Sequence, residues 1–265
     1  MKRFLVLLLA LICVGTLIYG SLHWKEKTSV SAEKADTQEQ TKEEPEQQET
    51  PAKVDTEKLL KLTENWPKAA REHYKMALEE GRPFTILLAG SNALGTDDEG
   101  WSIQLKHSLE EAYGDTIEVE VKSYELTSSE FMSEEKLDEL VSLQPDLTLL
   151  EPFTLMDNGL VMISNSHQNI EAIRSGLSEA NPEHVMLLQP PNPLYNANYY
   201  PVQVDALKQF AEEEEIPYLN HWTAWPDPES KEIEDYLVEQ DGTTLPNEKG
   251  HQVWYEYLLD YFIAD

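Results

Sequence analysis

The chain is poor in cysteine and in basic residues. Its 265 residues include one cysteine, and 20 lysines and arginines stand against 50 aspartates and glutamates, for a formal net charge of −30. The cysteine, Cys13, lies in the apolar N-terminal run, so the rest of the chain has neither disulfides nor cysteine metal sites. The charge argues against a nucleic-acid partner, because few groups can neutralise phosphates. No two histidines have the His-x-x-x-His spacing, which disfavours a metalloenzyme.

The first 24 residues have the pattern of a membrane anchor. Two basic residues precede a charge-free apolar run at 4–19. A cleaved signal peptide is the alternative, with Gly20 before the cut, but Ile18 fits poorly where a small residue is needed. We therefore predict an uncleaved single-pass anchor over 1–24, with the C-terminal part outside the cytoplasmic membrane.

Residues 25–56 have the composition of a spacer. They contain no aromatic residue and are rich in Glu, Gln, Lys and Thr, so they cannot bury enough apolar surface to offset the entropy of ordering. We predict a disordered acidic linker here and a folded domain over 57–265. Apolar residues at helical spacing predict that 57–82 is a helical extension at the start of this domain.

From residue 83 onwards, short apolar runs alternate with amphipathic segments. The runs with strand character are 83–91, 116–126, 146–153, 184–191 and 216–222. The segments with helix character are 101–114, 133–144, 167–182, 200–214 and 247–263. This alternation predicts an α/β domain, with a parallel sheet of about five strands and helices on both faces. In such sheets, active groups gather at the carboxyl ends of the strands.

At three of these strand ends the chain resembles the SGNH/GDSL hydrolase family. The sequence AGS (89–91) occupies the place of the family's Gly-Asp-Ser turn, and LLEPFTLMDNG (149–159) that of Gly-x-Asn-Asp. DGTTLPNEKGHQVW (241–254) resembles the last motif, Asp-x-x-His-Pro-Asn. The resemblance covers 84–265 and implies the family's three-layer, flavodoxin-like fold, with Ser91 as nucleophile and no metal or organic cofactor.

The chain departs from the family at two positions. Leu245 stands where the family has its catalytic histidine, and Met156, beside Asp157, stands where it has the oxyanion-hole asparagine. A serine needs an adjacent base, which leucine cannot provide. The first substitute is His221, at the end of the fifth expected strand, and the second is His167. Asp157 is an acidic candidate, although a turn residue is an equal explanation.

Glu151 is a further catalytic candidate, because it directly follows the third expected strand. Burial there would raise its pKa and suit proton transfer; alternatively, its carboxylate accepts hydrogen bonds from loop amides near Ser91. Gly90 and Asn92 flank the serine and complete the expected oxyanion and substrate site. Asn158 would replace the family's asparagine if its loop is displaced by two residues.

The loop at 189–201 is rich in Pro, Tyr and Asn, and Trp222 and Trp225 follow near the same edge. Tyrosines and amides can hold sugar rings by stacking and hydrogen bonding; rigid loops packed by aromatic rings are the alternative. His251, in the first turn of the last helix, is expected to have no catalytic role.

The sequence thus predicts a monomeric esterase or deacetylase of the SGNH type, built around Ser91. Its expected substrate is an O-acylated cell-envelope glycan outside the cytoplasmic membrane. Leu245 supports an alternative, a catalytically degenerate module that binds a glycan or protein partner at the cell surface. An acyl-transferase accessory is a third, weaker hypothesis.

Overall fold

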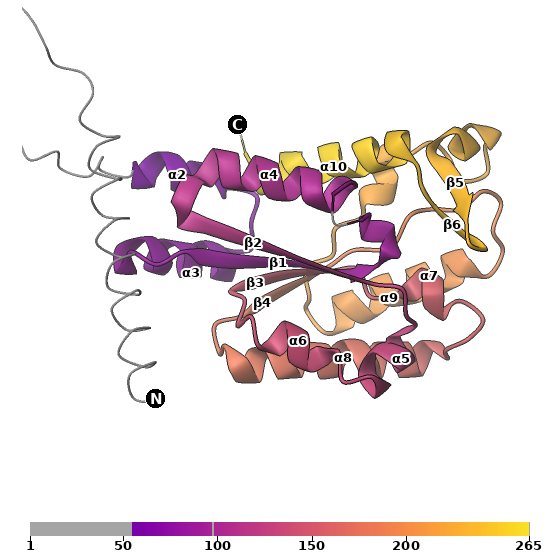
Figure 1. Ribbon diagram of the computed structural model, residues 1–265, viewed down its shortest axis with the longest axis horizontal. Helices are drawn as coiled ribbons and strands as arrows, with labels where there is room; N and C mark the ends of the chain where they lie inside the picture. The colour runs from indigo at the N-terminus through magenta and orange to yellow at the C-terminus, as the bar shows by residue number, and fades with distance from the viewer. Residues whose placement is uncertain (1–54, 97, 265) are drawn as a thin grey trace, which may run out of the picture. The chain divides into compact units, whose positions relative to one another are not determined.

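A parallel sheet forms the centre of the fold (Figure 1). Its strands are β1 (Phe84–Ser91), β2 (Ile117–Tyr124), β3 (Leu147–Leu150) and β4 (Val185–Leu188), in the order β2-β1-β3-β4. β1 and β3 are almost entirely buried. Such continuous apolar runs are typical of strands that are covered on both faces.

The computed structural model describes residues 55–96 and 98–264. The anchor predicted over 1–24 and nearly all of the linker predicted over 25–56 lie outside the described residues. Within the described part, no helix has both the length and the apolar character needed to cross a membrane. The described residues form one compact unit.

Helices cover both faces of the sheet (Figure 1). The first face carries α2 (Thr56–Leu62), α3 (Lys68–Glu80), α4 (Trp101–Tyr113) and α10 (Glu248–Phe262). The second face carries α5 (Ser128–Ser133), α6 (Leu137–Val141), α7 (Thr154–Asp157), α8 (Ile163–Ala180) and α9 (Tyr200–Glu213). Short 3₁₀ turns are η1 (Asn92–Leu94), η2 (Gly114–Thr116), η3 (His221–Ala224) and η4 (Lys231–Tyr236).

Alternation along β1 separates the two cores. Ile86 and Leu88 pack in the first core, whereas Leu87 and Ala89 pack in the second, because successive side chains of a strand point to opposite faces. This arrangement confirms the predicted three-layer α/β fold.

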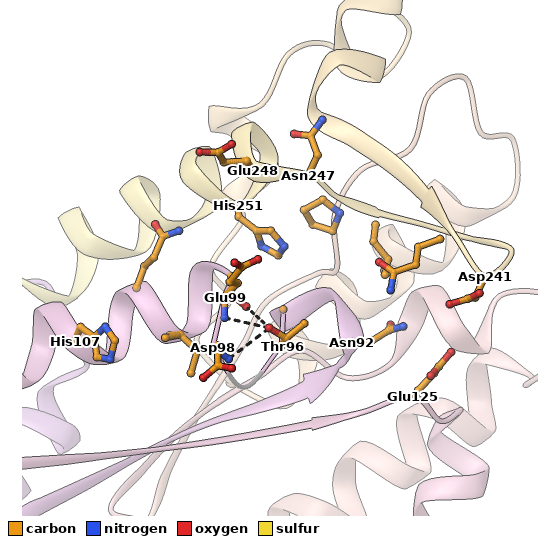
Figure 2. A pocket seen from close by; sticks show the side chains of 17 residues that line it. Asn92, Thr96, Asp98, Glu99, His107, Glu125, Asp241, Asn247, Glu248 and His251 are labelled. Atoms are coloured by element: carbon orange, nitrogen blue, oxygen red, sulfur yellow. Dashed lines mark hydrogen bonds between the residues drawn. The ribbon is translucent and has the colours of Figure 1, made fainter.

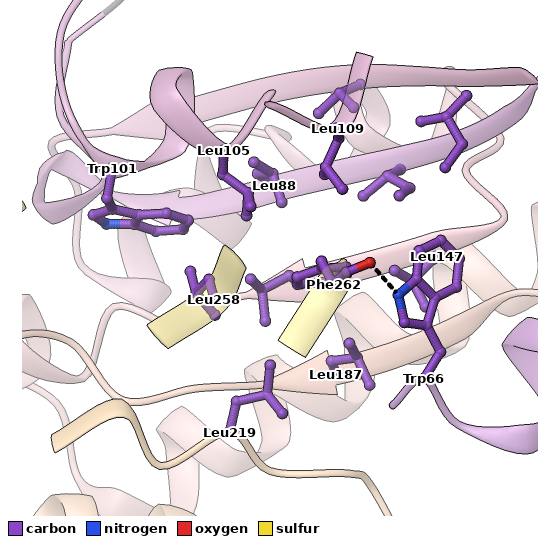
Figure 3. Close-up of a cluster of buried hydrophobic side chains, with 14 of the residues drawn as sticks. Trp66, Leu88, Trp101, Leu105, Leu109, Leu147, Leu187, Leu219, Leu258 and Phe262 are labelled. Carbon is purple, nitrogen blue, oxygen red and sulfur yellow. Dashed lines mark hydrogen bonds between the residues drawn. The ribbon is translucent and has the colours of Figure 1, made fainter. Parts of the chain in front are cut away.

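The N-terminal helices are part of the first core. Trp66, between α2 and α3, is 4% exposed and packs against Tyr74, Phe84 and Phe262. Its indole Nε1 donates a hydrogen bond to the Phe262 carbonyl at 2.9 Å, which ties α2 and α3 to the end of α10 (Figure 3).

The fifth expected strand, at 216–222, is reduced to one bridge. Tyr218 pairs in parallel with Leu188. Pro217 has no N–H for a longer ladder, and η3 begins at His221. The sheet therefore has four strands, with this segment beside β4.

The helix expected over 133–144 is two shorter helices, α5 and α6. Thr127 and Glu130 form a capping box that starts α5 at Ser128, and Glu135, with a φ of 58°, interrupts the chain before α6. The sequence TSSE is the signature of such a box, so the earlier start has a local cause.

A two-stranded hairpin lies outside the main sheet. β5 (Leu237–Gln240) pairs with β6 (Thr243–Pro246) in antiparallel register. Asp241 and Gly242 connect the two strands, with φ values of 51° and 85°. Two consecutive positive φ angles are typical of the type I′ turn that Asp-Gly favours.

Candidate active site

Ser91 is the last residue of β1, and its backbone is held by Glu151. The Ser91 N–H donates to Glu151 Oε2 at 2.7 Å, and Ser91 Oγ accepts from the Ala93 N–H at 3.2 Å. The serine is only 1% exposed. A Cβ on Gly90 would lie 2.6 Å from the Glu151 carbonyl oxygen, so a residue without a side chain is needed for β1 to come this close.

Glu151 is fully buried, and its Oε1 has no hydrogen-bond partner among the described residues. Burial raises the pKa of Glu151 to about 7, although hydrogen bonds from the Ser91 side chain and backbone oppose the shift. The two roles considered for Glu151 from the sequence, a desolvated carboxylate and an acceptor for a loop amide, are therefore present in one side chain.

His221 is fully buried and both of its ring nitrogens are engaged. Nε2 lies 2.8 Å from the Pro190 carbonyl, and Nδ1 accepts from Trp225 Nε1 at 2.9 Å. The ring stacks on Trp254 with centroids 3.9 Å apart. Since an indole N–H can only donate, Nδ1 is unprotonated, and burial lowers the pKa of His221 to about 3. In this arrangement His221 packs the first core and does not bond to Ser91.

His167 lies on α8, on the other side of the sheet. Its ring stacks on Phe210 with centroids 4.6 Å apart, and burial lowers its pKa. It borders a small cavity that also contacts Gln203. The structure therefore brings neither His167 nor His221 into a hydrogen bond with Ser91.

Asp157 and Asn158 hold neighbouring helices together. Asp157 is 1% exposed and accepts from the N–H and Oγ of Ser128, each at 2.7 Å, at the first residue of α5. Burial raises the pKa of Asp157. Asn158 Oδ1 accepts from Gln203 Nε2 on α9 at 3.1 Å. Both side chains thus have structural partners, and none of these hydrogen bonds involves Ser91.

Aromatic side chains of the loops at 189–201 and 221–225 form hydrogen bonds with backbone carbonyl groups of the first loop. Trp222 Nε1 donates to the Pro191 carbonyl at 2.6 Å, and the Tyr200 hydroxyl donates to the Asn192 carbonyl at 3.0 Å. Trp225 is buried against His221. These contacts correspond to the packing alternative, while Tyr199 remains 82% exposed.

A cleft of about 720 Å³ lies beside the serine loop, between η1, the start of α4, the β5–β6 turn and the start of α10 (Figure 2). Asn92 lines it and directly follows Ser91, and the buried Asn92 Oδ1 has no hydrogen-bond partner in the part of the chain that the structure describes. Leu245, 6% exposed, also lines the cleft. His251, for which no catalytic role was expected, also lines this cleft.

The cleft lining is acidic. It includes the carboxylates Asp98, Glu99, Glu125, Asp241 and Glu248. The described lining residues include two histidines but no lysine or arginine. Across residues 55–96 and 98–264, no group of three or more His, Cys, Asp or Glu side chains is placed to hold a metal ion.

Neither protein-family models nor curated proteins match the sequence. Solved structures do match the fold. A GDSL-like lipase from Parabacteroides merdae superposes with a TM-score of 0.55 at 11% identity, covering 68% of this chain and 96% of its own. An acetyl xylan esterase superposes with a TM-score of 0.53 at 12% identity, and the match covers 66% of this chain and 98% of the esterase. A lipolytic protein of the G-D-S-L family from Desulfitobacterium hafniense superposes with a TM-score of 0.51 at 18% identity. The match covers 67% of this chain and 98% of that protein.

These likenesses establish the fold. The chain has the α/β architecture of SGNH/GDSL hydrolases, and the resemblance drawn from its motifs is confirmed at that level.

Proposed function

We propose that this chain is an ester hydrolase of the SGNH type, in which Ser91 is the nucleophile and Glu151 is its proton acceptor. The observation that carries the proposal is the contact between these two residues. The Ser91 N–H donates a hydrogen bond to Glu151 Oε2 at 2.7 Å, while Glu151 Oε1 has no hydrogen-bond partner among the described residues.

The chemistry follows from the properties of Glu151. A base works best when its pKa lies near the working pH, and burial raises the pKa of Glu151 to about 7. The carboxylate takes the Ser91 proton as Oγ attacks the acyl carbon, and returns it to the departing alcohol. Water then cleaves the acyl-serine by the same route in reverse, which restores Ser91 and releases the acid.

The donors that stabilise the oxyanion come from Asn92 in this proposal. The Ser91 N–H is occupied by Glu151, so the backbone N–H and side-chain amide of Asn92 remain beside the reacting centre. Asn92 also lies between Ser91 and the cleft. A substrate that enters by the cleft would therefore pass Asn92 before it reaches Ser91, which is 1% exposed.

We further propose that the substrate is an O-acylated glycan of the cell envelope, and that residues 1–24 tether the monomeric protein to the outer side of the cytoplasmic membrane. The apolar N-terminal run and the acidic spacer support the location. An acetyl xylan esterase among the proteins of similar fold supports the substrate class. Protease digestion of intact cells should remove the domain; resistance in intact cells with digestion after lysis would contradict the location.

Labelling with a fluorophosphonate tests the chemistry. The wild-type protein should label, Ser91→Ala should not, and Glu151→Gln should label at least about 100-fold more slowly, as expected for loss of a general base. His167→Ala is the matched control and should label at the wild-type rate. Circular dichroism confirms that each variant is folded. Equal labelling of Ser91→Ala and wild type would refute Ser91 as nucleophile.

The alternative is a catalytically degenerate module that binds its ligand in the cleft. One observation favours it: the buried Leu245, on β6, stands at the position of the family's catalytic histidine. A folded wild-type protein that does not label but does bind a glycan would support this alternative over the hydrolase.

A further inference from the structure

His251 presents one ring nitrogen to the cleft and uses the other within the fold. It lies in the first turn of α10, and its Nδ1 accepts a hydrogen bond from the Trp101 N–H, at the start of α4, at 3.2 Å. Figure 2 shows the ring extending from α10 towards the loop that carries Glu99. No hydrogen-bond partner is found for Nε2 among the described residues, and His251 lines the cleft.

The partner of Nδ1 fixes the tautomer of this histidine. A backbone N–H can only donate, so Nδ1 carries no proton. The neutral ring must then have its hydrogen on Nε2. A second proton on Nδ1 would oppose the Trp101 N–H, and burial lowers the pKa of His251 to about 4. The cleft thus contains an uncharged donor at a fixed position.

The surrounding carboxylates limit which ligand groups can bind beside His251 Nε2. Asp98, Glu99, Glu125, Asp241 and Glu248 line the cleft, and none of them forms an ion pair within the described part of the chain. Phosphate and carboxylate ligands would meet uncompensated negative charge. A hydroxyl group can accept from His251 and donate to a carboxylate.

We infer that His251 Nε2 donates a hydrogen bond to a ligand hydroxyl, and that the cleft selects uncharged or amine-bearing glycans over polyanionic ones. That the ligand is a glycan rests on the proposed function. The donor role of His251 and the exclusion of anions do not require Ser91 to react.

Binding is therefore measured in the Ser91→Ala variant, which separates it from hydrolysis. Isothermal titration compares a tetramer of N-acetylglucosamine with a tetramer of galacturonic acid. We expect the neutral tetramer to bind at least about tenfold more tightly, because every anionic ring faces the carboxylates. Equal or tighter binding of the galacturonate tetramer would overturn the inference. So would failure of the neutral tetramer to bind; labelling of wild-type Ser91 would then leave the hydrolase proposal intact.

Two matched substitutions separate the ligand-binding role of His251 from its structural one. Asparagine places its oxygen near the position of Nδ1 and keeps an acceptor for Trp101, whereas glutamine places its amide near Nε2 and keeps the donor. We expect His251→Asn to weaken binding about three- to tenfold, the usual effect of one lost neutral hydrogen bond, without lowering Tm. His251→Gln should bind within about threefold of the parent. The reverse order would mean that His251 only supports the fold.

Discussion

At the residue scale, Glu151 joins the interior to the candidate site. Its buried carboxylate accepts the Ser91 N–H, and its backbone lies against Gly90. An ionisable group at such a position makes the stability of the whole protein depend on its charge, because burial disfavours the ionised form.

We expect the pH dependence of stability to change in Glu151→Gln. The pKa of Glu151 rises from 4.5 to about 7 on folding, so the folded protein holds this proton more tightly than the unfolded chain. Glu151 therefore reduces the free energy of unfolding as pH rises from about 4.5 to 7, by a total on the order of 3 kcal/mol.

Urea unfolding between pH 4.5 and 8 measures this effect. The difference in the free energy of unfolding between Glu151→Gln and wild type should grow with pH and become constant above about pH 7.5. Parallel curves for the two proteins would show that Glu151 has an ordinary pKa.

Gly90 is required for the close approach of β1 to Glu151. In Gly90→Ala, the new Cβ would lie 2.6 Å from the backbone oxygen of Glu151, and backbone cannot move aside cheaply. We expect a loss of about 1–3 kcal/mol in the free energy of unfolding.

The control is Gly176→Ala, within α8, where the added Cβ meets only the flexible side chain of Leu137 at 3.2 Å. Alanine is the better helix former, so this variant should be neutral or more stable in the same urea experiment. Similar destabilisation of both variants would argue against the crowding of Gly90.

Sequence reasoning located Ser91 and Glu151 because both follow apolar strands, and parallel strands end at one rim. It could not find the surroundings of His221, because Trp254, on which that ring stacks, comes from a distant helix. The position of His251 in the cleft could not be predicted for a related reason. The Trp101 N–H orients its ring, and nothing in the local sequence indicates that pairing.

At the element scale, an aromatic stack helps to hold α10 against the fold. Trp254 lies between Trp101 and His221, with centroid distances of 4.9 and 3.9 Å, and its Nε1 donates to Gln189 Oε1 at 2.9 Å. Gln189 follows β4 and is fully buried, and its Nε2 has no hydrogen-bond partner within 55–96 and 98–264.

Trp254→Phe should therefore lower the free energy of unfolding by about 2–3 kcal/mol, since it leaves a buried amide without its last side-chain partner and removes ring contacts. The control Tyr255→Phe loses only a part-buried hydrogen bond to Ser108 and should cost less than about 1 kcal/mol. Thermal unfolding compares the two. An equal cost would mean that the Gln189 contact contributes little.

Elements with local signals were the most predictable. The continuous apolar runs of β1 and β3 predict buried strands, and both form. The segment at 216–222 has similar apolar character, but Pro217 and the turn at His221 limit it to a bridge. The β5–β6 hairpin was not predicted, although Asp241-Gly242 is a recognised turn signal; the motif resemblance drew attention to the same residues instead.

At the scale of the whole molecule, like charge is the dominant electrostatic feature. The chain carries a formal charge of −30, and the ion pairs of its described part are largely exposed. Exposed pairs contribute little stability, whereas self-repulsion of the net charge opposes folding.

We expect Tm to rise with ionic strength. Increasing NaCl from about 0.02 to 0.5 M shortens the screening length several-fold, and each kcal/mol gained corresponds to about 2–4 °C in a domain of this size. Tetramethylammonium chloride should give the same increase, because screening does not depend on the identity of the cation. A fall in Tm would show that attractive pairs outweigh the repulsion.

The three layers could be predicted because the spacing of apolar residues in each helix and strand indicates which of its faces is buried. The cleft could not, because its walls come from segments that lie far apart in the chain, from Asn92 to His251.

Trp101 contacts three parts of the fold. Its backbone N–H orients His251, its indole donates to the Ala93 carbonyl at 3.0 Å, and its ring rests on Trp254. Ala93 in turn contacts Ser91. Trp101 thus contacts both a wall of the cleft, through its backbone, and the loop after Ser91, through its side chain. A smaller residue would keep the backbone contact with His251 but lose the indole hydrogen bond and the stack on Trp254. A substitution here should therefore disturb the loop after Ser91 more than the orientation of His251.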